Sequence, residues 1–167
     1  TNALVEGQGA RVAQVLIGFD TSQRSRARLA EALAGDPLIE LAGGHGHAGD
    51  EAAPLDLPAL EAALDALPEG ITGLAVAASF ATRNPAHENA ARDLIRARTG
   101  LPVTCSHELS AALGGPRRAL TALLNARLIT LIDRLITACE THLARRAISA
   151  PLMVVRGDGA LVSAAMV

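Results

Sequence analysis

Residues 71–80 read ITGLAVAASF, an almost continuous apolar run. A strand that is apolar at nearly every position is typical of a parallel sheet that helices cover on both faces. An Asn-Pro pair at residues 84 and 85 then starts a helix that runs to about residue 98, and Gly100 ends it. Residues 101–105 (LPVTC) form the next expected strand. This strand–helix–strand spacing predicts a βαβ unit, and therefore an α/β fold with a parallel-type sheet and flanking helices.

The same alternation extends toward the N-terminus. The pattern predicts two short strands and two helices there, at residues 11–19, 37–41, 23–34 and 57–67. Residues 42–50 (AGGHGHAGD) are too rich in glycine for regular structure and predict a loop. Residues 84–88 (NPAHE) are explained by helix capping, because Asn84 can accept first-turn N–H groups and Glu88 lies near the positive end of the helix dipole. A structural role is favoured for His87, and facing a site is its alternative.

Toward the C-terminus the pattern predicts one long helix and a last strand. Residues 116–147 have the helical period, and one face of that helix is expected in the core. Its apolar positions are 120, 124, 128, 131, 135 and 139, and positions 123, 132, 136 and 143 widen it. Residues 151–155 (PLMVV) predict the strand, and residues 156–159 (RGDG) predict its turn.

The composition excludes several classes of protein. A net charge of −2 without a basic stripe argues against a nucleic-acid partner, and no stretch of about 18 apolar residues exists that could span a membrane. The two cysteines, Cys105 and Cys139, have neither a disulfide pattern nor metal-binding spacing. We expect both to be small buried side chains in a reducing compartment, and the protein to be cytoplasmic.

A histidine-rich loop holds the densest cluster of ligand-type side chains. His45 and His47 stand two residues apart, and Asp50 and Glu51 follow them. Such a set could bind Zn²⁺ or Mn²⁺, or contact a substrate, with the carboxylate completing the site. A polar loop with solvated histidines is the alternative, and the sequence assigns no further, distant ligand.

Polar residues at two other places could line a cleft. His107 and Glu108 follow an expected strand, at the end of the sheet where α/β proteins bind ligands. A turn that caps its own backbone is the alternative for this pair. Arg118, Thr121 and Asn125 share one face of the long helix. They could line a cleft between domains, or equally lock the helix to a loop through hydrogen bonds.

Six stretches of the chain, in order, carry a family likeness. They are TNALVEGQGARVAQV at 1–15, PLD at 54–56, FATRNPAHE at 80–88, PVTCSHE at 102–108, RALTALLNA at 118–126 and PLMVVRGDGALVS at 151–163. Together they cover nearly the whole chain and resemble the motifs of the hydantoinase/oxoprolinase A family, the N-methylhydantoinase A-like proteins. Two departures are typical of a divergent subfamily. Ala119 replaces the usual threonine, and Val155-Arg156-Gly157 precedes Asp158 where the family has Met-Gln-Ser.

The resemblance implies an actin-like, sugar-kinase-like ATPase fold and makes the chain an interior segment of a longer protein. Residues 1–112 would end the N-terminal domain, and residues 113–167 would start the hydantoinase A domain with the long helix and a strand. The family's two glycine-rich phosphate loops are not within these 167 residues. Residues 17–22 (IGFDTS) lack the glycine hairpin of such a loop, so a strand exit with a capping residue is the favoured interpretation.

The resemblance further implies the chemistry of the longer protein. It would be a hydrolase that opens a cyclic amide, such as hydantoin or 5-oxoproline, after ATP with Mg²⁺ phosphorylates the amide oxygen. Its expected partners are the small-molecule cyclic amide and either a hydantoinase B-type subunit or a second copy of itself. The segment alone is expected to be inactive. The alternative function is a non-catalytic scaffold that binds a partner within a hydantoinase-like complex.

For this segment, the resemblance implies substrate-binding residues rather than phosphate-binding ones. They are expected to be Arg118, Thr121, Asn125 and Asp158, together with His107 and Glu108. Asp158 lies between two glycines, which permit a ligand to approach the backbone closely.

Overall fold

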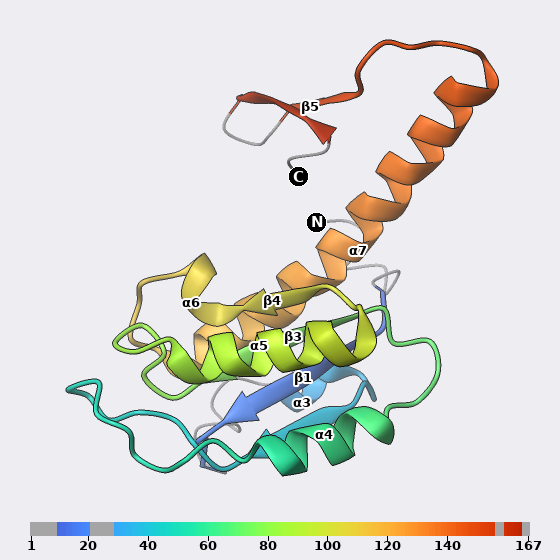
Figure 1. Ribbon diagram of the computed structural model, residues 1–167. Helices are drawn as coiled ribbons and strands as arrows, with labels where there is room; N and C mark the ends of the chain where they lie inside the picture. Colours follow the sequence, from blue (N-terminus) through green and yellow to red (C-terminus); the bar gives the residue numbers. More distant parts are fainter. Residues whose placement is uncertain (1–9, 21–28, 156–158, 165–167) are drawn as a thin grey trace. The chain divides into compact units, whose positions relative to one another are not determined.

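A four-stranded parallel sheet is the centre of the fold. The computed structural model describes residues 10–20, 29–155 and 159–164. The sheet contains β1 (Val12–Ile17), β2 (Leu38–Leu41), β3 (Gly73–Ala78) and β4 (Val103–Cys105), in the order β2-β1-β3-β4. Every neighbouring pair is parallel. The predicted α/β fold with a parallel sheet and flanking helices is confirmed (Figure 1).

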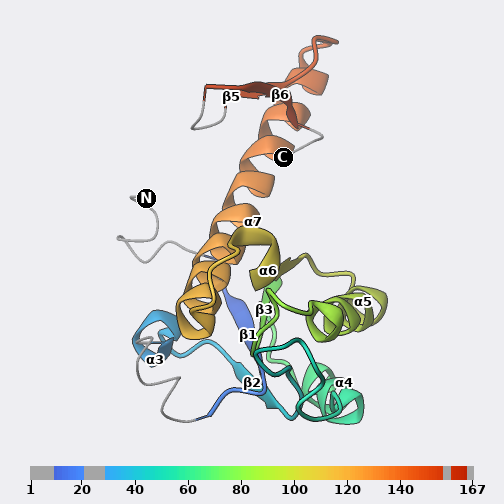
Figure 2. The same cartoon turned by 90° about the vertical axis from the view of Figure 1, so that its left-hand side faces the viewer.

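Helices cover both faces of this sheet. The helices α4 (Leu57–Asp65) and α5 (Ala86–Thr99) lie on one face, whereas α3 (Leu29–Leu33) and the first part of α7 (Gly115–Arg145) lie on the other (Figure 2). Because side chains alternate along a strand, the central strands supply side chains to both layers. All residues of β1 and β3 are therefore buried, as the apolar run at residues 71–80 predicts.

The two layers differ in the size of their side chains. On the α4 and α5 face, Leu60 and Ile95 pack in one cluster with Val76, and fully burying a side chain of this size stabilises the fold by about 1.5–3 kcal/mol. On the α7 face, Ala75 and Ala77 of β3 share a cluster with alanines of the helix. Small side chains on both partners allow the helix backbone to approach the sheet closely.

The expected core face of α7 is confirmed near the start of the helix and wrong farther along, since Leu123 is buried and Leu120 packs against the core as expected. The buried residues of the helix are Ala119, Ala122, Leu123 and Ala126. Leu131 and Leu135 are instead 36% and 64% exposed. The spacing of the leucines predicts a face of large side chains. The sheet presents alanine to this helix, however, so a stripe of small side chains packs against it.

One arginine ties α7 to the end of α3. Arg127 donates from Nη1 to the carbonyl oxygen of Ala32 (2.6 Å) and from Nη2 to that of Leu33 (2.9 Å). Nη2 also donates to Asp36 Oδ2 (2.8 Å). A cation at the carbonyl end of a helix satisfies groups that have no partner within the helix.

Element boundaries differ from the expected ones by small amounts. The helix α5 begins at Ala86 rather than Pro85, although Asn84 Oδ1 still accepts the Ala86 N–H (3.1 Å). Residues 106–109 form a short helix, α6 (Ser106–Leu109), where a turn or a cleft wall was expected. Of the helix expected at residues 23–34, the structure describes only α3 and the turn after it.

The chain divides into two compact units, Thr1–Thr130 and Leu131–Val167. In the second unit, the described residues form the last part of α7 and an antiparallel hairpin of β5 (Met153–Val155) and β6 (Leu161–Ser163). The strand expected at residues 151–155 is confirmed, whereas β6 was not predicted. The family-domain boundary expected between residues 112 and 113 stays a prediction. Within the described residues, no helix combines the length and apolar character that crossing a bilayer requires.

The strand order creates a topological switch point. From β1 the chain passes to β2 on one side and then to β3 on the other side of β1. In open parallel sheets, ligands bind at the carboxyl ends of the two strands where the order reverses. These ends are Ile17 and Ala78, and they point toward the side of the molecule where α6 and the loop between β2 and α4 lie (Figure 1).

Candidate functional site

The histidine loop (residues 42–51) crosses the carboxyl end of β1 in close backbone contact. Gly18 follows β1 with a φ of 71°, and Gly43 has a φ of 138°. A Cβ atom at Gly18 would collide with the carbonyl oxygen of Gly43, and one at Gly43 would lie 2.7 Å from Cγ2 of Ile17. Both positions require glycine, for space and for backbone conformation. The crossing brings His45 to the end of β3, where its N–H donates to the Ser79 carbonyl oxygen (3.1 Å).

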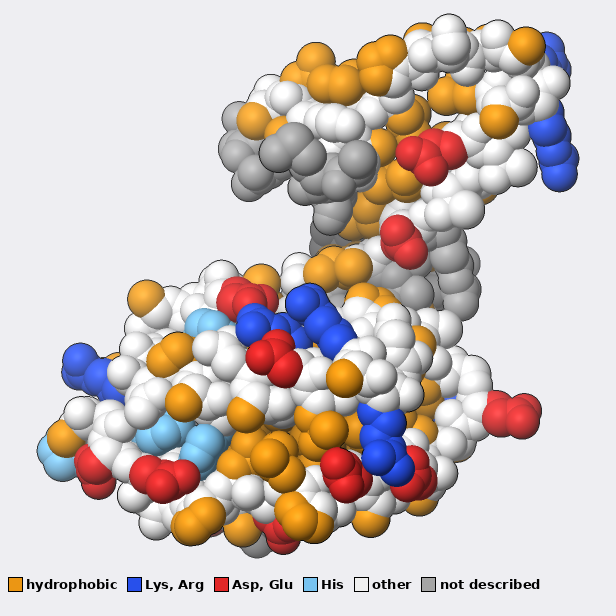
Figure 3. Space-filling model, in the orientation of Figure 1, with side chains coloured by type: hydrophobic (Ala, Val, Ile, Leu, Met, Phe, Trp, Pro, Cys, Tyr) orange, Lys and Arg blue, Asp and Glu red, His pale blue; other side chains and the backbone are white. Residues whose placement is uncertain are grey.

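His87, from the start of α5, is held by the histidine loop. Its Nδ1 accepts the N–H of Gly44 (2.9 Å). The ring therefore carries its proton on Nε2, which donates to Glu51 Oε1 (3.0 Å). The ring of His45 lies against that of His87, with 4.3 Å between their centroids. Figure 3 shows histidine side chains beside acidic ones on this face of the molecule.

His45 is a buried histidine with an unsatisfied ring nitrogen. The residue is 3% exposed, and its Nδ1 has no hydrogen-bond partner among the described residues. Burial lowers the pKa of His45, and His87 lowers it further, whereas Glu51 and Asp50 oppose the shift. The fold therefore favours the neutral ring.

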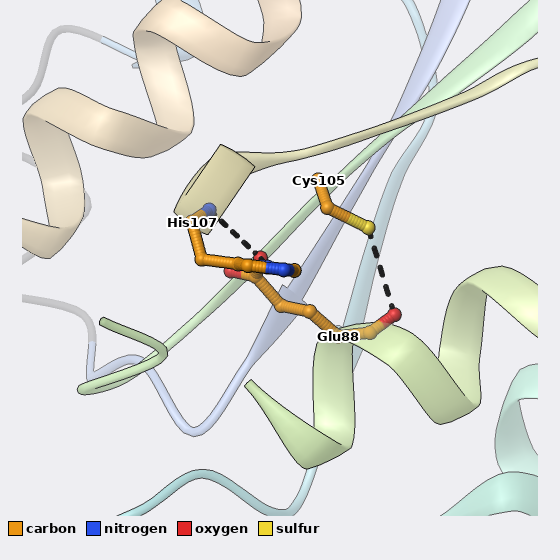
Figure 4. Close-up of side chains that lie close together, drawn as sticks. All are labelled: Glu88, Cys105 and His107. Atoms are coloured by element: carbon orange, nitrogen blue, oxygen red, sulfur yellow. Dashed lines mark hydrogen bonds and ion pairs between the residues drawn. The ribbon is translucent and has the colours of Figure 1, made fainter. Parts of the chain in front are cut away.

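A second group, the Glu88 cluster (Glu88, Ser106, His107 and Arg118), lies beside the first. The Glu88 carboxylate is fully buried and accepts four hydrogen bonds. The donors are Ala78 N (2.7 Å), Ser106 Oγ (2.6 Å), His107 N (3.0 Å) and His107 Nδ1 (2.6 Å). Four bonds use all the lone-pair directions of an ionised carboxylate. Glu88 thereby joins the end of β3 to α5 and α6. Figure 4 shows Glu88 of α5 beside His107 of α6.

Glu88, Cys105 and His107 are the one trio of metal-ligand side chains that the described part of the chain gathers, with ligand atoms within 4.8 Å of one another. A metal ion does not fit their bonding. The oxygens of Glu88 are already saturated, and burial raises the pKa of the Cys105 thiol to about 12. A protonated thiol is a poor metal ligand. We therefore interpret the trio as a hydrogen-bonded hub.

His107 is the member of the Glu88 cluster that reaches the surface. Its side chain is 18% exposed, whereas that of Glu88 is fully buried. Because Nδ1 donates to the carboxylate, Nε2 of a neutral ring is left as an acceptor. A buried carboxylate that holds one ring nitrogen fixes the tautomer and orients the other nitrogen, an arrangement used in general-base and metal-binding histidines.

Arg118 completes the cluster from the first turn of α7. The residue is 2% exposed, and its guanidinium donates to the carbonyl oxygens of Ala112 (2.7 Å) and Ala78 (3.2 Å) and to Ser106 Oγ (3.4 Å). Burial lowers the pKa of Arg118, and the Glu88 carboxylate opposes that shift. The sequence left two alternatives for Arg118, lining a cleft or locking the helix to a loop. This geometry agrees with the second.

A pocket of about 180 Å³ opens beside this cluster, at the carboxyl ends of β1 and β3. Its lining is Phe19, Ser79, Phe80, Leu113, Gly114, Gly115 and Pro116. Phe80 has a φ of 52°, in the left-handed region that costs a residue with a side chain about 1–2 kcal/mol. Such strained residues concentrate at ligand sites. The Phe19 ring packs so closely on Gly115 that a Cβ there would lie 3.1 Å from Cε1.

The residues expected on one face of the long helix have different surroundings. Arg118 is buried, Asn125 is half-buried, and Thr121 is exposed with its hydroxyl donating to the Arg117 carbonyl oxygen (3.0 Å). Asp158 lies outside the described residues. A substrate-binding role for these residues stays a prediction.

The structure separates the residues expected to bind a metal. His45 is buried against His87, whereas His47 and Asp50 are exposed. Of the other expected pair, His107 joins the Glu88 cluster, and Glu108 is exposed and accepts from Arg92 Nη1 (2.9 Å).

The sequence interpretation did not single out Glu88, Phe19, Phe80 or Ser79. Glu88 was assigned to capping alone, because its donors are 10 to 19 residues away and no helical spacing reveals them. A signal for the two phenylalanines did exist. They are the only aromatic side chains of the Phe, Trp and Tyr type in the chain.

Comparison with known proteins agrees with the fold. The chain is similar to the ATP-dependent caprolactamase from Pseudomonas jessenii, with a TM-score of 0.78 and 23% identity over 96% of this chain and 26% of that one. It is also similar to a nucleotide-free acetone carboxylase, with a TM-score of 0.65 and 15% identity over 97% of this chain and 27% of that one. The chain thus spans about a quarter of the length of either protein.

The sequence comparison is more specific. A search of the curated proteins gives no match. The model of the hydantoinase/oxoprolinase N-terminal region matches residues 1–99. Those residues include β1, β3 and α5, and with them His45, His87 and Glu88. Because this match covers more than half of the chain and agrees with the observed fold, the chain belongs to the hydantoinase/oxoprolinase family.

Proposed function

We propose that this chain is a segment of an ATP-dependent hydrolase that opens cyclic amides of the hydantoin or 5-oxoproline type. The family membership of residues 1–99 carries the proposal. A second support is that a protein described as an ATP-dependent caprolactamase has the same fold over 96% of the chain. Caprolactam is itself a cyclic amide, so the neighbour's name and the family agree on the class of substrate.

The segment's own contribution is the carboxyl edge of the sheet rather than a nucleotide site. ATP with Mg²⁺ would make the amide carbon electrophilic by phosphorylating the amide oxygen. The described residues after β1 do not fit a phosphate loop. The backbone of Gly18 packs directly against that of Gly43, which leaves no space there for a phosphate. The next two residues, Phe19 and Asp20, do not form a glycine hairpin. We therefore place no ATP or Mg²⁺ contact on them.

His107 is the residue of this segment best arranged for proton transfer. Glu88 holds its Nδ1–H at 2.6 Å and leaves Nε2 as a base at the surface. From this position Nε2 would accept a proton from the water that attacks the activated amide. The polar groups of Glu88 and Arg118 are satisfied internally, so their role is to position His107 and α7.

A non-catalytic scaffold within a hydantoinase-like complex is the second candidate. The polar groups of the Glu88 cluster hydrogen-bond to one another. Such a cluster can serve a purely structural purpose, which favours the scaffold.

The decisive experiment uses the full-length protein with any hydantoinase B-type subunit that accompanies it. ADP release is measured with hydantoin, 5-oxoproline and caprolactam. We expect at least one ring to accelerate ADP release about tenfold and to yield the ring-opened product. His107→Gln should lower kcat by about 10²-fold, whereas the matched His142→Gln, at an exposed histidine in the last turn of α7, should leave it within about twofold. If no ring amide stimulates ADP release, the hydrolase proposal is contradicted and the scaffold stands.

A further inference from the structure

The pocket at the switch point has an unusual composition for this chain. The sequence holds two phenylalanines and no tryptophan or tyrosine, and both phenylalanines line this one pocket. They come from different strands, since Phe19 follows β1 and Phe80 follows β3. Phe80 adopts its position in spite of a left-handed backbone, with a φ of 52°. Two aromatic residues thus line one pocket where an open α/β sheet places its ligand.

The pocket also offers a short polar edge. Ser79 is the polar residue of the lining, and its hydroxyl has no hydrogen-bond partner among the described residues. The start of α7, a helix of 31 residues, supplies the opposite wall through Gly114, Gly115 and Pro116. The N-terminal end of a helix carries partial positive charge. An oxygen with partial negative charge would therefore be stabilised between Ser79 and α7.

The lining contains no ionisable side chain within the described residues. The buried cation in the first turn of α7, Arg118, already donates to two carbonyl oxygens and the Ser106 hydroxyl. A ligand carboxylate would leave water for a pocket without a counter-charge, which is costly. The geometry suits a neutral ligand with one carbonyl edge and two apolar faces.

We propose that this pocket binds the ring of a neutral cyclic amide, such as a lactam or hydantoin, in preference to the carboxylate-bearing 5-oxoproline. This inference rests on the proposed function and narrows its substrate class. The volume of about 180 Å³ is suited to a single ring, since cavities of about 150 Å³ accept benzene. The ring packs between Phe19 and Phe80, and its carbonyl oxygen faces Ser79 and the start of α7.

The two phenylalanines provide the assay. In the 167-residue chain labelled with ring-¹³C phenylalanine, only two sets of aromatic signals arise, and both report on the pocket. The chain is titrated with caprolactam, hydantoin, 5-oxoproline and the open-chain N-methylacetamide, without nucleotide. We expect saturable shifts of both phenylalanines with the neutral rings, and at least tenfold weaker binding of 5-oxoproline and of the open-chain amide.

Two variants test the site and one controls for it. Phe80→Gly removes a ring yet suits the positive φ, so the backbone is retained, and Phe19 still reports. Gly115→Ala places a methyl group 3.1 Å from the Phe19 ring and narrows the pocket. Each should weaken caprolactam binding about tenfold. Leu109→Ala, at an apolar residue that is 38% exposed and outside the lining, should leave it unchanged.

The outcomes separate this inference from the proposed function. Shifts that are absent, that do not saturate, or that are as strong with 5-oxoproline overturn the pocket assignment, even if the full-length protein opens rings with ATP. Saturable binding of neutral rings, lost in both variants, supports the assignment. It does so even if ADP release by the full-length protein shows no dependence on any ring, a result that would remove the hydrolase proposal alone.

Discussion

At the scale of single residues, Glu88 is the side chain on which the carboxyl edge depends most. Glu88→Gln replaces one acceptor oxygen by an NH₂ group, so two of the four donors face another donor. Leaving buried donors unsatisfied should lower the free energy of unfolding by about 2–4 kcal/mol, measured by urea denaturation. Glu108→Gln is the control, because its exposed pair with Arg92 should be worth less than about 1 kcal/mol. Equal losses in both variants would contradict the hub.

His45 should make the stability depend on pH. Burial lowers its pKa in the folded state below the ordinary 6.5. The unfolded chain therefore binds more protons below pH 6.5, and the free energy of unfolding should fall as the pH drops from about 6.5 toward the folded pKa. Above pH 6.5 the ring of His45 is neutral in both the folded and the unfolded chain, so none of this stability is lost.

The pH test compares variants, so that the effect of His45 is separated from that of every other group. His45→Phe keeps a ring and removes the titration, so its free energy of unfolding should fall less between pH 7.5 and 5.5 than that of the wild type. His47→Gln, at an exposed position, should retain the wild-type slope. If the free energy of unfolding of His45→Phe changes with pH as much as that of the wild type, burial of His45 does not make the stability depend on pH.

Residue roles were harder to predict than residue positions. The sequence singled out the stretch containing His107, because the end of a parallel strand is a general ligand-binding place, and a binding role for it stays a prediction. It could not reveal that Glu88 bonds His107, since their contact depends on how α5 docks against β4. The proximity of His45 and His47 in sequence suggested a shared ligand, yet one side chain is buried and the other exposed.

At the scale of elements, the start of α7 is fixed by one of two adjacent arginines. Arg118 is buried and donates to Ala78, Ala112 and Ser106, whereas Arg117 is exposed. Arg118→Met keeps the apolar stem but leaves three acceptors without that donor. It should lower the free energy of unfolding by about 2–4 kcal/mol. Arg117→Met should change it by less than about 0.5 kcal/mol.

One outcome would contradict the proposal that Arg118 holds the start of α7 in place. If Arg118→Met unfolds at the same urea concentration as Arg117→Met, the guanidinium does not hold the helix. The cleft role expected from the sequence would then be the better account of this residue.

Elements whose residues are large and apolar could be predicted well. The strands expected at residues 11–19 and 37–41 are observed as Val12–Ile17 and Leu38–Leu41, because runs of branched apolar residues have few other places in a fold. The core face of α7 could not be predicted in the same way. Its buried stripe consists mostly of alanine, which is common on helix surfaces too and carries little pattern of its own.

At the scale of the whole molecule, the core is distributed unevenly along the chain. Among the described residues, the buried apolar side chains all lie at or before Ala126, with the exception of Ala164. In the second unit, Leu135, Val155 and Leu161 are between 62% and 69% exposed. A two-stranded hairpin is marginally stable by itself. Cooperative folding should therefore be a property of the first unit.

Two truncated chains test where that unit ends. A chain ending at residue 130 keeps the alanine stripe of α7 and the bonds of Arg118 and Arg127, so its melting temperature should lie within about 5 °C of the main transition of the full chain. A chain ending at residue 112 follows the boundary expected from the sequence. It exposes Ala75 and Ala77 and leaves Glu88 without the nearby cation, so it should melt at least about 15 °C lower or without a cooperative transition. Circular dichroism at 222 nm would measure both. Similar melting temperatures for the two chains would mean that α7 adds little to the sheet and that the folding unit ends where the sequence placed the domain boundary.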